Sequence, residues 1–283
     1  MGSWLEPIRG ALDHSPDPVT FFFRDDDGGW HDDRLLALLD LFAEPGLPLD
    51  LALIPTDLGT EIASELAGRV DSSGGRLGLH QHGLAHRNHE PDGRRCEFGP
   101  SRSRSDQLRD IAEGRDLLRA QLGARIQPIF TPPWNRCTSV TGECLVELEF
   151  SALSRESRAE PLGIPALVEL PVQLDWFAHR KRIRLTRGEV GETLANGIGG
   201  GQPVGVMFHH ALMDDAELGD AALLLGLLAG HPSARVRPMI ELIASAASPK
   251  SSPERWRQRS GRRVQRNFAS CTRASARYHA SES

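Results

Sequence analysis

In the stretch Leu79-His80-Gln81-His82-Gly83-Leu84-Ala85-His86-Arg87-Asn88-His89, four histidines fall within ten positions, directly after a short apolar run. His82 and His86 stand four residues apart, a spacing that places both imidazoles on one face of a helical turn, as two ligands of one metal ion require. A third ligand is expected from Asp25-Asp26-Asp27-Gly28, which ends the apolar run of residues 19–23. The two stretches meet if both follow strands of one parallel sheet.

Apolar strand-like runs and helical patterns alternate at least five times along the chain, which predicts an α/β fold with a parallel sheet or barrel. The strand-like or apolar runs are residues 19–24, 49–54, 76–80, 126–130, 150–153, 167–174 and 204–208. The expected helices are residues 34–43, 61–70, 105–122, 143–148, 189–198 and 221–229, with 235–243 of uncertain type and a loose leader before residue 18.

Residues able to do chemistry follow these strands at their carboxyl ends. Because the carboxyl ends of parallel strands share one rim, these residues are expected to lie together. They are Asp25 to Asp27, His80 to His86, Thr131 to Trp134, Asp175-Trp176 and His209-His210. The sequence therefore predicts a functional rim.

Composition excludes several classes of partner. A net charge of −5 and a pI near 6.1 complement neither nucleic acid nor an anionic membrane. Residues 1–7 lack the basic and apolar segments of a secretion signal, and no apolar run approaches the ~18 residues of a membrane span. We expect a cytoplasmic protein.

Cys96, Cys137, Cys144 and Cys271 show no CxxC spacing, so free thiols are expected; a Cys137–Cys144 bridge is the alternative. From residue 248 to 283, Ser, Arg and Pro dominate, which predicts a disordered basic tail after a catalytic domain of residues 1–247. A nucleic-acid or membrane arm is the alternative for this tail.

The order of the motifs resembles the NodB-homology polysaccharide deacetylase family. Its strand-end Asp-Asp-Gly, which supplies a base and a metal ligand, is similar to Asp26-Asp27-Gly28, and its His-x-x-x-His is similar to the segment from His82 to His86. The later motifs correspond to Pro132-Pro133-Trp134, Asp175-Trp176 and Met207-Phe208-His209. The resemblance covers residues 19–215 and implies a deformed (β/α) barrel of about seven parallel strands.

The chain departs from the family in two places. Thr131 stands where the family carries the arginine that would pair with Asp175, and Arg136 or Arg24 is a candidate substitute. The triple aspartate also leaves the register open, with Asp25 and Asp26 as the alternative base and ligand. For the acid, strand alternation favours His209 over His210, because only one of them can face the barrel mouth.

The resemblance implies hydrolysis of an N- or O-acetyl group on a carbohydrate. Asp27, His82 and His86 would bind a divalent metal, zinc first, with cobalt, nickel or manganese as alternatives. A His-His-carboxylate set leaves positions open for water and substrate, and a zinc-bound water has a pKa of about 7. Asp26 would take the proton of this water, and His209 would protonate the leaving group.

Other residues would bind the substrate. A backbone N–H near Trp134 would hold the oxyanion, an effect of about 3 kcal/mol. Pro133 and Asp175 would line the groove, and the indoles of Trp134 and Trp176 offer flat faces to a sugar ring. His80 and His89 are expected to support the site or lie on the surface, since three ligand places are filled.

Two other functions remain open. A metal-free hydrolase of cyclic amides on the same fold predicts that His82 or His86 is dispensable. A carbohydrate-binding protein without catalysis is conceivable because of Thr131, although the five residues expected to bind metal and transfer protons are all present. These are Asp26, Asp27, His82, His86 and His209.

Overall fold

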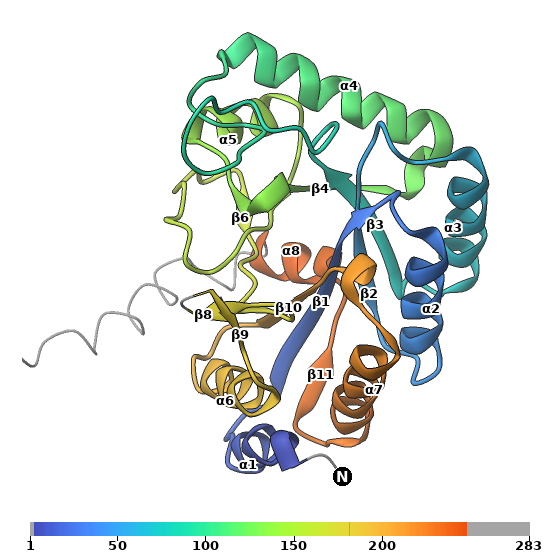
Figure 1. The fold of residues 1–283 in the computed structure, drawn as a ribbon, viewed down its shortest axis with the longest axis vertical. Helices are drawn as coiled ribbons and strands as arrows, with labels where there is room; N and C mark the ends of the chain where they lie inside the picture. The colour runs from blue at the N-terminus through green and yellow to red at the C-terminus, as the bar shows by residue number, and fades with distance from the viewer. Residues whose placement is uncertain (1–2, 181, 248–283) are drawn as a thin grey trace, which may run out of the picture. The chain divides into compact units, whose positions relative to one another are not determined.

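The computed structural model describes residues 3–180 and 182–247. Its main sheet has the strand order β6-β5-β4-β3-β2-β1-β10-β7, with β11 paired to β1, and the registers are parallel throughout (Figure 1). The strands are β1 (Val19–Gly28), β2 (Leu49–Leu53), β3 (Leu77–His82), β4 (Ile126–Thr131), β5 (Ala152–Leu153), β6 (Val168–Glu169), β7 (Leu174–Asp175), β10 (Val204–Phe208) and β11 (Ala234–Val236). The predicted α/β fold with a parallel sheet is confirmed.

The sheet curls into a deformed half-barrel. Its two outer strands, β6 and β7, are separated in sequence by residues 170–173 alone. Because so short a segment spans at most about 18 Å, the outer edges of the sheet must approach each other. The apolar stretch 167–174 therefore supplies two strands at opposite edges.

Helices surround the sheet. They are α1 (Glu6–Asp13), α2 (Asp32–Ala43), α3 (Thr60–Ser72), α4 (Arg104–Leu122), α5 (Ser139–Glu147), α6 (Arg187–Ile198), α7 (Asp215–Gly230) and α8 (Met239–Ala247). Short 3-10 turns are η1 (Ser3–Leu5), η2 (Gly123–Arg125), η3 (Pro133–Asn135) and η4 (His210–Leu212), and β8 (His179–Arg180) pairs antiparallel with β9 (Ile183–Arg184). The expected loose leader is wrong: it is helical because Ile8 and Leu12 are fully buried on one face of α1. The segment 235–243, whose type was uncertain, contains the end of β11 and the start of α8.

Alternation along β1 separates two environments. Phe21 and Phe23 belong to the large apolar cluster under the helices. Phe22 belongs to a second cluster that includes Ile129 and, from α8, Met239. Helix α8 thus packs inside the half-barrel, at the end where β11 joins the first residues of β1.

The barrel interior also contains buried polar groups. Asp50 on β2 is fully buried, and its Oδ2 accepts a hydrogen bond from the backbone N–H of Met239 at 2.9 Å. A Cβ atom on Gly78 would lie 2.1 Å from Asp50 Oδ1, so glycine is required opposite this carboxyl group. Burial raises the pKa of Asp50 to about 7, even though the Met239 N–H favours the ionised form.

Three further sequence-based expectations concern cysteines, membrane spans and the tail. Cys96, Cys137 and Cys144 are free thiols, as expected. Within the described residues, no helix is long and apolar enough to cross a membrane. Cys271 and the predicted tail, residues 248–283, lie outside the described residues.

Candidate metal centre and active site

Asp27, His82 and His86 converge at the carboxyl ends of the strands. One ligand atom from each lies within 4.8 Å of the other two, and Nε2 of both histidines is 3.2 Å from Asp27 Oδ1. Asp27 lies near the end of β1 and His82 ends β3. Two imidazoles and one carboxylate form a donor set suited to a divalent metal with open coordination positions.

The two histidines reach this cluster without a helix between them, which corrects the expected helical turn. The chain turns sharply after β3, with Gly83 at φ 60° and His86 at φ 50°. Glu97 holds the turn: its carboxylate accepts hydrogen bonds from the backbone N–H groups of Leu84 and Ala85, at 3.2 and 2.9 Å, and from that of Arg87 at 3.4 Å. Asp27 itself has φ 68°, an uncommon value for a non-glycine residue, which often marks a functional site.

Hydrogen bonds orient the ring of His82 and shift the pKa values of Asp27 and His82. Nδ1 of His82 donates to the carbonyl of Thr131 at 3.0 Å, which leaves Nε2 directed at Asp27. Burial opposes ionisation of Asp27, but hydrogen bonds from His82 and His86 outweigh it and hold the pKa of its carboxyl well below the usual range. Burial lowers the pKa of His82, but the hydrogen bond to Asp27 and nearby carboxylates more than compensate and raise it.

Asp26 and Arg24 form a buried pair inside the barrel. Arg24 Nε lies 2.7 Å from Asp26 Oδ1, and Nη2 lies 2.9 Å from Oδ2. The guanidinium also donates to Ser154 Oγ at 2.6 Å and to Asn135 Oδ1 at 2.7 Å. Burial raises the pKa of Asp26, but the charges of Arg24, His82 and His209 together more than compensate and lower it, so Asp26 is a carboxylate.

Neither candidate substitute makes the expected pair with Asp175. Arg24 pairs with Asp26, whereas Asp175 accepts the backbone N–H of Phe177 at 2.9 Å and faces His209. Arg136, the other candidate, donates to the carbonyl of Arg95 at 2.9 Å.

The two histidines after β10 have different surroundings. His209 is partly exposed, and its Nδ1 lies 3.8 Å from Asp175 Oδ1. His210 is fully buried and contacts Asp25, with Nδ1 2.6 Å from Oδ2. Burial lowers the pKa of His210, but the charge of Asp25 and the hydrogen bonds to Asp25 and to the carbonyl of Trp30 together raise it to about 9. The structure thus engages Asp25 and His210 with each other, and neither belongs to the Asp27, His82 and His86 cluster.

Aromatic residues border the cluster. The ring of Trp134, partly exposed and at φ 55°, lies 4.4 Å from that of His86 between centroids. Pro133 is buried and lies against Gly83, in the turn after β3: a Cβ atom on Gly83 would be only 2.7 Å from the proline ring. The ring of Trp30, which sequence reasoning missed, lies 4.9 Å from that of His86.

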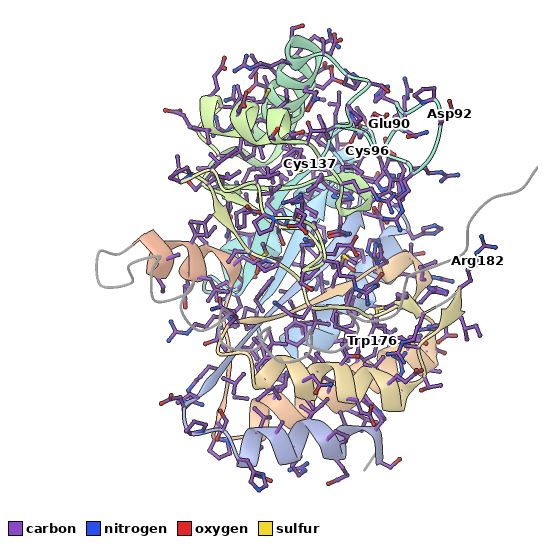
Figure 2. All side chains as sticks on the ribbon, turned by 90° about the vertical axis from the view of Figure 1, so that its left-hand side faces the viewer. Glu90, Asp92, Cys96, Cys137, Trp176 and Arg182 are labelled. Atoms are coloured by element: carbon purple, nitrogen blue, oxygen red, sulfur yellow. The ribbon has the colours of Figure 1, made fainter. Side chains whose placement is uncertain are left out.

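Trp176 corrects the expectation of a sugar-stacking surface. Its side chain is labelled within the ribbon in Figure 2, and the residue is 1% exposed. Its ring packs against those of Phe208 and Trp4, and Nε1 donates to Glu217 at 2.7 Å. A sugar cannot reach a face that the core covers.

The buried side chain of His80 links β3 to β4. Its Nε2 lies 2.9 Å from Thr131 Oγ1, and burial lowers its pKa to about 3, so it is neutral. Of the groups that sequence reasoning missed, Glu97 gave no signal, because an acid ten or more residues from the turn belongs to no pattern. Trp30 gave a weak one, because it follows the Gly28-Gly29 pair directly after the aspartates.

A groove of about 770 Å³ lies beside Asn135, the residue that holds Arg24. Glu90, Asp92, Cys96 and Cys137 line it and gather at one end of the molecule in Figure 2. Burial raises the pKa of the Cys137 thiol to about 12, so this cysteine is not a nucleophile.

The fold is that of the polysaccharide deacetylases. A protein from Mycobacterium smegmatis assigned to this class superposes with a TM-score of 0.60 at 14% identity, covering 84% of this chain and 94% of that chain. A Streptococcus mutans CE4 esterase gives 0.55 at 12%, covering 83% and 90%. A CE4 family pseudoenzyme from Bacillus anthracis gives 0.52 at 10%, covering 81% and 66%. No protein-family model matches the sequence, and no curated protein matches it significantly.

Proposed function

We propose that this protein is a metal-dependent hydrolase that removes an N- or O-acetyl group from a carbohydrate. The observation that carries the proposal is the convergence of Asp27, His82 and His86 within 4.8 Å of one another. The Arg24–Asp26 pair and the His209–Asp175 pair belong to the ends of the neighbouring strands β1, β10 and β7. This set contains a metal site, a carboxylate base and an imidazole acid.

Asp27, His82 and His86 would hold the metal, with zinc, cobalt, nickel or manganese as candidates. When bound, such a metal lowers the pKa of a water ligand and polarises the acetyl carbonyl. Asp26 would accept the proton of the attacking water. It is ready to do so because nearby positive charges, that of Arg24 foremost, keep it ionised.

His209 would donate a proton to the departing amine or alkoxide. Its partial exposure lets it reach substrate, and Asp175 Oδ1 lies 3.8 Å from its Nδ1. A backbone N–H near Trp134 would hold the developing negative charge on the carbonyl oxygen. Trp134 would offer its partly exposed indole face to the sugar, and Pro133 and Asp175 would line the groove.

Chelation tests the proposal. The purified protein is assayed for metal content and for acetate release from 4-nitrophenyl acetate, chitotetraose and acetylated xylotetraose, before and after treatment with EDTA. We expect EDTA to abolish release and zinc to restore it, and Asp27→Asn to abolish release at any zinc concentration. His14→Asn, at an exposed histidine directly after α1, is the control.

The same assay separates the other functions. A metal-free hydrolase keeps its turnover in EDTA. A protein that only binds carbohydrate releases no acetate with or without zinc, a possibility raised by the structural similarity to a pseudoenzyme. Either result would overturn the proposal.

A further inference from the structure

Two tryptophans, one of them outside every motif considered so far, border the same metal-ligand candidate. The ring of Trp30 lies 4.9 Å from that of His86, with 65° between the planes, and the ring of Trp134 lies 4.4 Å away, with 59° between the planes. Trp30 belongs to the loop between β1 and α2, and Trp134 to the 3-10 turn after β4. Both are partly exposed.

Two polar groups of Trp30 are hydrogen-bonded to residues distant in sequence. Its indole Nε1–H donates to a carboxylate oxygen of Asp57, in the loop after β2, at 2.5 Å. Its backbone carbonyl accepts a hydrogen bond from Nε2 of His210 at 2.6 Å. A surface tryptophan held only by packing would have no such constraints, so its ring position is defined.

His210 is in turn held by Asp25. Oδ2 of Asp25 lies 2.6 Å from Nδ1 of His210, and Oδ1 accepts the backbone N–H of His210 at 2.9 Å. Both side chains are fully buried. Oxygen atoms thus face both ring nitrogens of His210, and the imidazole is held between Asp25 and the carbonyl of Trp30.

A buried polar pair contributes little net stability compared with apolar residues of the same volume, which is consistent with a positioning role. Here the pair joins the end of β1, the turn after β10 and the carbonyl of Trp30. It places an aromatic ring beside His86, where a substrate bound at the cluster would lie. Flat indole faces suit the apolar C–H face of a sugar ring.

We propose that Trp30 is a second carbohydrate-contacting wall of the site, and that the buried Asp25–His210 pair positions it. This inference rests on the proposed function and specifies its substrate: a saccharide wide enough to touch both Trp30 and Trp134, rather than a small acetyl ester. Asp25 and His210 act through Trp30 and are positioning residues.

Steady-state kinetics of the zinc-loaded enzyme test the wall. The readout is the ratio of kcat/KM for an acetylated tetrasaccharide to kcat/KM for 4-nitrophenyl acetate, which has no sugar ring. We expect Trp30→Ala to lower this ratio about tenfold, mainly through KM, and Trp30→Phe to recover most of it. Leu223→Ala, an exposed apolar residue on α7, is the control.

A pair of substitutions tests the positioning role. An asparagine amide at position 210 can take the place of Nδ1 and keep the bond to Asp25, whereas a glutamine amide can take the place of Nε2 and keep the bond to Trp30. We expect His210→Asn to lower the ratio as Trp30→Ala does, and His210→Gln to keep it. His210→Asn added to Trp30→Ala should lower the ratio no further.

Several outcomes would overturn the inference. An unchanged ratio in Trp30→Ala excludes the wall, and additive effects in the double variant exclude positioning through Trp30. Zinc affinity that falls in parallel with the ratio assigns Trp30 to holding His86 instead. If the wild-type protein hydrolyses the aryl ester but no oligosaccharide, Trp30 does not contact a carbohydrate substrate, although the proposed hydrolase activity is retained. If it hydrolyses neither substrate, the proposed function itself is excluded.

Discussion

Arg24 and Asp26, two residues apart on β1, join their side chains through two hydrogen bonds of 2.7 and 2.9 Å inside the barrel. Alternate residues of a strand point to the same face, so this spacing directs both side chains inward. Both are buried, and the pair provides the base with a cation from its own strand. The motif order would place an arginine at Thr131; here the cation comes from elsewhere.

Removing the Arg24 cation is expected to damage both activity and stability. Arg24→Gln leaves Asp26 buried without its partner, which should lower the free energy of unfolding by about 3–5 kcal/mol and kcat by about 100-fold. Arg24→Lys should recover part of the stability but less of kcat, because lysine cannot form the paired contact. Urea unfolding and aryl-ester kinetics at 15 °C measure the two effects; wild-type kcat in Arg24→Gln would contradict the assignment.

The role of His209 predicts a dependence on the leaving group. An amine or alkoxide needs a proton as it departs, whereas 4-nitrophenolate leaves without one. His209→Asn should therefore lower kcat for an N-acetylated sugar by about 100-fold, and lower it much less for 4-nitrophenyl acetate. Zinc content, measured in parallel, should stay at the wild-type level. Equal losses on both substrates would show that His209 is not the acid.

Glu97 is expected to control metal affinity through the backbone. Its carboxylate accepts the N–H groups of Leu84 and Ala85 in the turn that carries His86. Glu97→Gln replaces one acceptor oxygen by an amide donor and should weaken zinc binding by about 10- to 100-fold. Glu90→Gln, in the same loop but bonded to Ser101, is the matched control. Calorimetric titration of zinc gives both affinities, and equal affinities would exclude the role.

Asp50 predicts a pH dependence of stability. Burial raises its pKa in the folded state from 3.8 to about 7, so the protonated carboxyl favours folding. The stabilisation is complete below pH ~4 and is lost as the pH rises through ~7, by about 4 kcal/mol in all. Asp50→Asn should remove this loss and be more stable than wild type at pH 8. Denaturant unfolding between pH 4 and 8 compares the two, with Asp71→Asn, on the surface, as control.

Much of the site followed from the sequence because parallel strands end on one rim. The aspartates after residue 24 and the histidines after residue 79 were expected to meet, and Asp27, His82 and His86 do lie together. Short apolar runs located the strands without showing their ends. Thus β1 extends to Gly28, and the aspartates lie within the strand instead of after it.

Side-chain direction was beyond the sequence. Three adjacent aspartates have three different surroundings: Asp25 contacts His210, Asp26 contacts Arg24, and Asp27 turns toward His82 through a left-handed backbone conformation. A shift of one residue in a strand exchanges the two faces, and a positive φ breaks the alternation altogether. Composition does not reveal where that break occurs.

By itself the sequence determined most of the alternation of strands and helices along the chain and the rim at which acidic and imidazole groups gather, because hydrophobic periodicity and strand polarity are local properties of the chain. Tertiary structure alone decided which aspartate faces which partner, that Arg24 pairs with Asp26, that Trp176 is covered by Phe208 and Trp4, and that Trp30 borders the cluster. Those outcomes depend on register and packing between segments distant in sequence, and no local pattern encodes them.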